Sequence, residues 1–307
     1  MPIDHFSPGA ANAAVTQAGY SAPYRYLLED DKLPQGQRQR KSFQERRIHA
    51  IAKACRDGAG QGREDLYKPW IRIRRNFSSP YSHQAFSSVA LRPTNHHFLS
   101  KLEFHTALHC AYLGATELRE CLPEWPHDHP HPHSGLLDDD EFRGSDVRGL
   151  LDIARHAGID HGVYVGTNVP YVASLDLMFR FPWKRRWRYV GISCKPEQIF
   201  RQSSRAQERV ELDRLYCNAI DTRHVLEDGA AFNQVLVQQM QWMLPLTSEA
   251  RCAERKSKLR DFAGCFEELA EDRPVLSAVL GAGKRLRLNR EDSLSLFRQC
   301  VWLHLID

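Results

Sequence analysis

The sequence predicts a mixed α/β fold, with a sheet core flanked by helices and a small, mainly helical domain after it. Three observations lead to this prediction. Residues 174–181 and 186–194 are strand-like and are separated by a tight basic connection, which is typical of an antiparallel hairpin. Amphipathic segments of helical spacing precede and follow this hairpin. Past residue 229, all remaining segments have helical periodicity.

The composition is that of a globular protein with room for two domains. Its 307 residues are 42% hydrophobic and 26% charged, and the formal net charge is +4. This mild positive charge permits an anionic partner such as nucleic acid without requiring one. The eight cysteines include no C-x-x-C pair, which indicates reduced structural thiols and disfavours a zinc ribbon. Because no long apolar run or secretory signal is present, we expect a cytoplasmic protein without membrane contact.

The composition changes along the chain and divides it into three regions. Residues 1–42 end in the run QGQRQRK, and we interpret them as a flexible basic arm. Such an arm is either a solvated tail or a segment that follows a DNA backbone. Residues 43–245 contain the predicted sheet and its helices, and residues 246–307 are predicted to form the helical C-terminal domain.

The first predicted elements precede the hairpin. A helix should begin after Ser42, because Ser42 and Glu45 have the spacing of a capping box. The segment IRIRR (71–75) alternates apolar and basic residues as a half-exposed strand does, and SSVALR (87–92) is a second strand candidate. The segment HHFLSKLEFHTALHCAYLG (96–114) has the leucine spacing of a strong helix.

The stretch HDHPHPHSGLLDDDEFRGSD (127–146) is polar and interrupted by prolines. We interpret it as a solvated surface insertion. Its ligand types permit a transition-metal site as the alternative, but nothing apolar is expected to shield such a site. A helix over 146–158 should be capped by Asp146. A helix over 205–219 and a short strand over 222–228 follow the hairpin.

Two acidic residues and a lysine are the candidate catalytic groups. Glu103 lies in the helix predicted over 96–114, Asp176 in the first hairpin strand, and Lys195 at the end of the second. Phosphodiester hydrolysis uses Mg²⁺ held by one or two carboxylates, and a lysine can position the attacking water or stabilise developing charge. This element order, helix with Glu, strand with Asp, strand ending in Lys, then helix, is also that of restriction-endonuclease-like nucleases.

Basic segments near these groups are candidate DNA contacts. They alternate with apolar residues in IRIRR or lie between tryptophans in WKRRWR, a composition that suits a nucleic-acid backbone with stacking. The WKRRWR composition also suits an ordinary solvated hairpin tip, and the sequence leaves both interpretations open. The residues concerned are Arg72, Arg74, Arg75, Lys184, Arg185 and Arg186.

Seven local strings, in order, resemble those of the TnsA endonuclease family, and together they cover about residues 43–245. They are GAGQG with the following YKPW (58–70), HHFLSKLE (96–103), ELRECLPEWP (117–126), AGIDH (157–161), SLDLMF (174–179), ISCKP (192–196) and ERVELDRLYCNAID (208–221).

The resemblance implies a role for each matching residue. Glu103 and Asp176 would bind the metal, Mg²⁺ or Mn²⁺, and Lys195 would be the catalytic lysine. Ser193 stands where restriction enzymes usually have an acidic residue and where this family often has Gln. Because a hydroxyl is a weaker metal ligand, Ser193 would either assist through its hydroxyl or a water, or weaken metal binding and activity.

The resemblance also implies a function. Members of the family are hydrolases that cut double-stranded DNA at the 5′ ends of a transposon in the bacterial cytoplasm, together with a TnsB-like DDE transposase and a TnsC-like AAA+ regulator. Residues 246–307 would then be a winged-helix-like domain that contacts the regulator and DNA, although a plain packing module fits as well. Two alternatives stay open: a catalytically weak architectural subunit, which Ser193 motivates, and an unrelated restriction or repair nuclease of the same fold.

Overall fold

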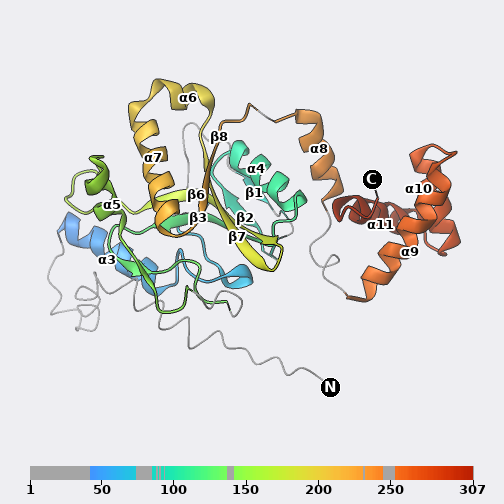
Figure 1. The fold of residues 1–307 in the computed structure, drawn as a ribbon, viewed down its shortest axis with the longest axis horizontal. Coiled ribbons are helices and arrows are strands. Elements are labelled where there is room, and N and C mark those ends of the chain that lie inside the picture. Colours follow the sequence, from blue (N-terminus) through green and yellow to red (C-terminus); the bar gives the residue numbers. More distant parts are fainter. Residues whose placement is uncertain are drawn as a thin grey trace, which may run out of the picture. The chain divides into compact units, whose positions relative to one another are not determined.

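The structure is a computed structural model that separates into two compact units (Figure 1). Unit 1 holds the described residues up to position 81 together with Glu117–Gly229, and unit 2 holds Ser82–Thr116 and Ala230–Asp307. These divisions differ from the predicted domain boundaries after residues 42 and 245, which stay predictions. The structure describes residues 42–73, 85–87, 89, 91–92, 94–136, 142–230, 232–244 and 253–306.

Unit 1 is built on a four-stranded mixed sheet in the order β3-β6-β7-β8. The strands β6 and β7 form the predicted antiparallel hairpin, β3 pairs antiparallel with β6, and β8 runs parallel to β7. The mixed α/β class and the strands expected over 174–181, 186–194 and 222–228 are therefore confirmed. The strand bounds are Glu117–Glu124 for β3, Ala173–Trp183 for β6, Arg186–Cys194 for β7 and Arg223–Glu227 for β8.

Helices pack on this sheet through an apolar core. The helix α7 contacts β7 and β8, and α5 packs against α7. The contact between sheet and helix is close at Gly191, where an added Cβ would lie 2.6 Å from the Cys217 sulfur and 2.8 Å from Leu175. The helices of unit 1 are α3 (Phe43–Arg56), the 3₁₀ turn η4 (Glu64–Leu66), α5 (Leu150–Ala157), α6 (Glu197–Gln202) and α7 (Ser204–Ala219).

Two predicted caps can be checked against the structure. The capping box is confirmed: Ser42 caps α3, and its side chain and that of Glu45 bond each other's backbone N–H groups. The predicted cap by Asp146 is wrong, because Gly149 is the N-cap of α5. Residue 146 instead pairs with Pro130 in a short two-stranded sheet of β4 (His129–Pro130) and β5 (Asp146–Val147).

Unit 2 contains a short hairpin and five helices among its described residues. The helix predicted over 96–114 begins only at Lys101, because Ser100 caps it and the preceding residues form β2. The strand expected over 87–92 lies earlier, as β1. The elements are β1 (Ala85–Ser87), β2 (His96–Phe98), α4 (Lys101–Tyr112), α8 (Gln234–Met243), α9 (Ala253–Ala270), α10 (Val275–Arg285) and α11 (Arg290–Trp302).

The C-terminal segment is helical, as expected. Over 253–306 the structure has three helices, with no strand in that stretch, and they share a core around Phe262, Ala278 and Leu296. Further upstream, the strand predicted over 71–75 is absent from the part that is described, since residues 71–73 have no regular structure. Of the helices that the structure describes, none is long and apolar enough to cross a membrane.

The interpretation of 127–146 as a solvated insertion is wrong for three of its four histidines. His129, His131 and His133 are 2%, 7% and 0% exposed. The ring of His133 stacks on Tyr189 with centroids 3.6 Å apart, and His131 stacks on Phe142 at 4.3 Å. The apolar shield therefore comes from Tyr189 of β7 and from Phe142, which lies in the same segment.

The buried histidines make the protein sensitive to mild acid. Burial lowers the pKa of both His129 and His131 to about 4, whereas an exposed histidine titrates near 6.5. Between these values the unfolded chain binds more protons than the folded one, so stability is lost as the pH falls from about 6.5 towards 4. We expect the free energy of unfolding, measured with urea, to be about 2 to 4 kcal/mol lower at pH 5 than at pH 7.

Two variants test whether the buried histidines cause this loss of stability. His131→Phe keeps a ring against Phe142 and should remove about a third to a half of the pH-dependent loss, because His129 and His133 still contribute. The exposed His156 serves as the control, because His156→Gln should leave the loss unchanged. Equal stability of the wild-type protein at pH 5 and pH 7 would contradict the prediction.

Candidate functional site

The structure brings Asp176 and Lys195 together on neighbouring strands of unit 1. The Asp176 carboxylate oxygen Oδ2 accepts hydrogen bonds from Lys195 Nζ at 2.9 Å and from the Cys194 backbone N–H at 2.8 Å. The side chains of Asp176 and Lys195 are 16% and 28% exposed, so both can be reached from solvent. The pair is thus a fixed ion pair at the surface of the sheet rather than part of the closed core.

The backbone around Lys195 fixes this geometry. Lys195 directly follows the last residue of β7, and its backbone N–H donates to Glu227 O of β8 at 2.9 Å. Pro196, two residues after the end of β7, is the N-cap of α6. Burial disfavours the charge of Lys195, but the adjacent Asp176 carboxylate outweighs it and raises the pKa of the lysine above its ordinary value. Lys195 is therefore an ammonium ion at neutral pH, which can donate hydrogen bonds but cannot accept a proton.

Ser193 is fully buried and belongs to a hydrogen-bond network behind the ion pair. Its hydroxyl donates to Asp213 Oδ2 at 2.6 Å and lies 2.8 Å from His224 Nε2. The guanidinium of Arg209 forms ion pairs with both Asp213 and Glu124. Burial raises the pKa of Asp213, although Arg209 and the Ser193 hydroxyl oppose this. The Ser193 hydroxyl is thus engaged with α7 and β8.

The sequence did not reveal Asp213 and His224 as parts of this network. Asp213 follows Arg209 by four residues, which is the spacing of an ion pair on any exposed helix face. Its 2% exposure depends on the sheet beneath α7, and no local pattern marks that. His224 reaches Ser193 only because β8 lies parallel to β7.

Glu103 lies in unit 2, in the first turn of α4. Its carboxylate accepts hydrogen bonds from the Leu99 backbone N–H at 2.8 Å and from the Ser100 hydroxyl at 3.0 Å, and Ser100 in turn caps the helix. Glu103 is 5% exposed, and its carboxylate is bonded to residues just before its own helix. That Glu103 shares a site with Asp176 and Lys195 stays a prediction.

The candidate DNA-binding residues fall into two groups. Lys184, Arg185 and Arg186 are exposed at the turn of the β6–β7 hairpin. Arg72 is exposed in an irregular segment, whereas Arg74 and Arg75 lie outside the described residues.

Asp176 is suited to be one ligand of a magnesium ion. Its second oxygen, Oδ1, makes no hydrogen bond with the residues that the structure describes. Mg²⁺ is usually bound by one or two carboxylates, with waters and substrate phosphates completing the octahedron. Within the same residues, no three His, Cys, Asp or Glu side chains are grouped to hold a metal, so a closed site of the structural zinc type is not formed there.

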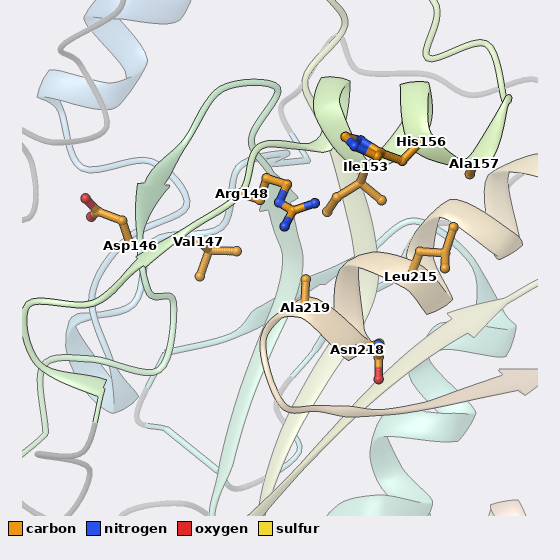
Figure 2. A pocket seen from close by; sticks show the side chains of 9 residues that line it. All are labelled: Asp146, Val147, Arg148, Ile153, His156, Ala157, Leu215, Asn218 and Ala219. Atoms are coloured by element: carbon orange, nitrogen blue, oxygen red, sulfur yellow. The ribbon is translucent and has the colours of Figure 1, made fainter.

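A pocket of about 560 Å³ lies elsewhere in unit 1, between β5, α5 and α7 (Figure 2). Apolar side chains such as Ile153 and Leu215 line it, and Arg148 and His156 add polar groups. None of the predicted catalytic residues lines this pocket. The candidate site is therefore the surface at Asp176 and Lys195 and not this pocket.

Two comparisons with known proteins bear on this site. No protein-family model matches the chain. A curated protein of Escherichia coli, the Tn7 transposition protein TnsA, is 26% identical to it over 223 residues. The aligned region covers 72% of this chain and 72% of the Tn7 protein.

Proposed function

We propose that this chain, which is TnsA-like by its sequence similarity to the Tn7 protein, is the metal-dependent endonuclease subunit of a heteromeric DNA transposase. It would hydrolyse phosphodiester bonds at the 5′ ends of a transposon. One observation carries the proposal: Asp176 and Lys195 form a solvent-accessible ion pair of 2.9 Å on paired strands, in a chain similar to a transposition protein over 72% of its length. The four-stranded mixed sheet supports a restriction-endonuclease-like core.

Asp176 and Lys195 would have different roles in catalysis. Asp176 would hold Mg²⁺ or Mn²⁺ through Oδ1, and Glu103 would be the second carboxylate. When bound, such an ion polarises the phosphate and lowers the pKa of a water. Lys195, held as an ammonium by Asp176, would orient the attacking water and stabilise the negative charge that develops on the phosphate oxygens.

We assign Ser193 a supporting part rather than direct chemistry. Its hydroxyl is bonded to Asp213, which is itself paired with Arg209 on α7. This network ties β7 to the helix one residue before the Cys194 N–H that binds Asp176. It would therefore hold the Asp176 carboxylate and Lys195 in register.

The proposed partners rest on the similarity to the Tn7 transposition protein. The substrate would be double-stranded DNA at transposon ends, and a TnsB-like DDE transposase would cut the other strands. We propose that residues 246–307 contact a TnsC-like AAA+ regulator and DNA through a helical domain, since residues 253–306 have none of the strands that form the wing of a winged helix. The shared core of the three helices within 253–306 supports an independent module there. The protein would act in the bacterial cytoplasm.

A second candidate function is a catalytically weak architectural subunit that bridges DNA and partner proteins. It is favoured by the position of Ser193, where restriction enzymes usually carry an acidic ligand. Because the Ser193 hydroxyl is bonded to Asp213 and His224, it is a poor replacement for that ligand. Such a subunit would assemble on transposon ends without cutting them.

The test is cleavage of a transposon donor DNA by the full chain together with its neighbouring transposase proteins. We expect nicks at the 5′ ends with Mg²⁺ or Mn²⁺ and none after chelation with EDTA. Complexes that assemble but never nick the 5′ ends with either ion would favour the architectural subunit. Nicks made by this chain without its partners would favour an unrelated restriction or repair nuclease.

A further inference from the structure

The end of the β6–β7 hairpin extends past the sheet as a two-stranded ribbon. Pairing of β3 with β6 ends at Arg180, and pairing of β8 with β7 begins at Val190. In the described part of the chain, residues 181–188 pair in the ladder only with each other across the turn. A β-ribbon of two strands is narrow enough to enter the major groove of DNA, which is about 12 Å wide.

The ribbon is basic and carries no acidic residue. From Leu177 to Pro196 the sequence contains no Asp or Glu. The exposed cations at and near the turn have no carboxylate partner among the described residues, whereas the exposed Arg155, Arg201 and Arg214 each pair with an acid of their own helix. The ribbon cations are Lys184, Arg185, Arg186 and Arg188. Their charge is therefore available to an anionic partner.

An aromatic ring is set among these cations. Trp183 is 48% exposed, and the guanidinium of Arg188 lies 3.9 Å above its ring. The register pairs Trp183 with Arg186, so all three side chains lie on one face of the ribbon. The tryptophan ring is fixed by an arginine and lies beside other cations. This combination suits a nucleic acid, with its phosphates and stacking bases, better than it suits a flexible acidic peptide.

The ribbon is also placed at a fixed distance from the candidate catalytic site. Asp176 and Lys184 belong to the same hairpin, eight residues apart, and a strand rises about 3.3 Å per residue. The turn is therefore about 26 Å from Asp176 along the strand. Because a DNA strand advances 3.4 Å per nucleotide, that span equals about seven to eight nucleotides.

We infer that residues 181–188 form a DNA-binding ribbon that contacts the duplex about seven to eight nucleotides from the phosphate at Asp176. The inference rests on the proposed function, because Asp176 sets the reference phosphate. Lys184, Arg185 and Arg186 neutralise backbone phosphates, and Trp183 packs on the adjoining sugar or base. The ribbon thereby positions the cleaved bond without taking part in the reaction.

The first test measures the affinity of the full chain for a transposon-end duplex at several salt concentrations. The test variant is Lys184→Asn, Arg185→Gln and Arg186→Gln; asparagine suits position 184 because its φ is +55°. Each lost phosphate contact should lower the slope of log K against log salt by about 0.9, so we expect a slope shallower by about 2 to 3. The matched control, Arg155→Gln, Arg201→Gln and Arg214→Gln, removes the same charge and should keep the wild-type slope.

The second test locates the contact. Uncharged methylphosphonates are placed singly along the duplex, and those about seven to eight nucleotides from the cleaved bond should weaken wild-type binding about tenfold. The ribbon variant should be insensitive to them. The inference would be overturned if wild type and ribbon variant were equally sensitive to the methylphosphonates, or if their salt slopes in the first test were equal. It would also be overturned if the wild type did not bind the duplex, or if the ribbon variant bound DNA normally but lost binding to a partner protein.

The two proposals can fail separately. Asp176→Asn removes no ribbon contact and should keep the wild-type salt slope. If Asp176→Asn stops cleavage while the ribbon variant binds DNA like wild type, the endonuclease stands and the ribbon is refuted. If the ribbon variant has the shallower salt slope but the wild-type chain never nicks DNA, the DNA-binding ribbon is supported and the endonuclease is refuted. The chain would then be an architectural subunit.

Discussion

Asp176→Asn should reduce the rate of 5′-end nicking by about a thousandfold or more while leaving the protein folded. Asparagine has the same shape and can still accept the hydrogen bonds from the Cys194 N–H and Lys195 Nζ. It lacks the negative charge that binds a divalent metal ion, and a loss of about 4 kcal/mol in transition-state stabilisation corresponds to that factor. Single-turnover nicking of donor DNA, with all partner proteins present, measures the effect.

A matched control separates catalysis from a general loss of charge. Asp152→Asn also neutralises an acidic residue of unit 1, one whose ion pairs with Arg148 and Arg155 lie at the surface of α5. It should nick DNA at the wild-type rate. Nicking by Asp176→Asn within about threefold of wild type would refute Asp176 as the central ligand.

Glu117→Ala should destabilise the protein by about 3 to 5 kcal/mol. Glu117 is 2% exposed and accepts hydrogen bonds from Arg63 at 2.9 and 2.7 Å and from the Glu64 backbone N–H. Arg119 and Arg180 approach the same carboxylate to 3.9 Å. Removal of this carboxylate would leave buried guanidinium groups without their shared partner, and an unpaired buried charge is costly. Urea unfolding at pH 7 measures the loss.

Two further measurements identify the cause of this loss. The double variant Glu117→Leu with Arg63→Met removes both charges and should be less destabilised than Glu117→Ala alone. Glu208→Ala removes an exposed ion pair with Arg205 and should change stability by less than about 1 kcal/mol. A Glu117→Ala protein as stable as Glu208→Ala would contradict the prediction.

The pH dependence of Glu117 has a definite sign. Burial acts to raise its pKa, but the charges of Arg63 and Arg119 outweigh burial and bring the pKa to about 2. The stability that comes from this shift is present above pH 4.5, the ordinary value, and is lost as the pH falls towards 2. It adds to the histidine effect, which begins nearer pH 6.5.

The sequence predicted those parts of the fold that depend on neighbouring residues. The hairpin of β6 and β7 follows from alternation and a short turn, and the start of α3 follows from the spacing of Ser42 and Glu45. Because the hairpin register is local, the closeness of Asp176 and Lys195 could also be expected before the structure. Their roles in catalysis stay predictions.

What the sequence could not predict depends on distant partners. The histidines of 127–136 look solvated in isolation, yet His133 is buried because Tyr189 of β7 and Thr222, just before β8, contact it. In the same way, Ser193 is found to bond Asp213, twenty residues away, only once α7 is placed on the sheet. Burial of polar residues is a property of the assembled layers, and local periodicity does not encode it.

The discontinuous course of unit 1 affects how the chain folds during synthesis. The chain leaves unit 1 after residue 81 and returns at Glu117, the first residue of β3. Roughly 50 residues must then be added before β6 begins, which takes about 3 to 10 s on a ribosome. During that interval β3 is a strand without its partner, and such strands aggregate unless charges interrupt them.

Half of β3 is charged, with Glu117, Arg119, Glu120 and Glu124 along its eight residues. The charges that later form buried ion pairs thus also protect the nascent strand from pairing with another chain.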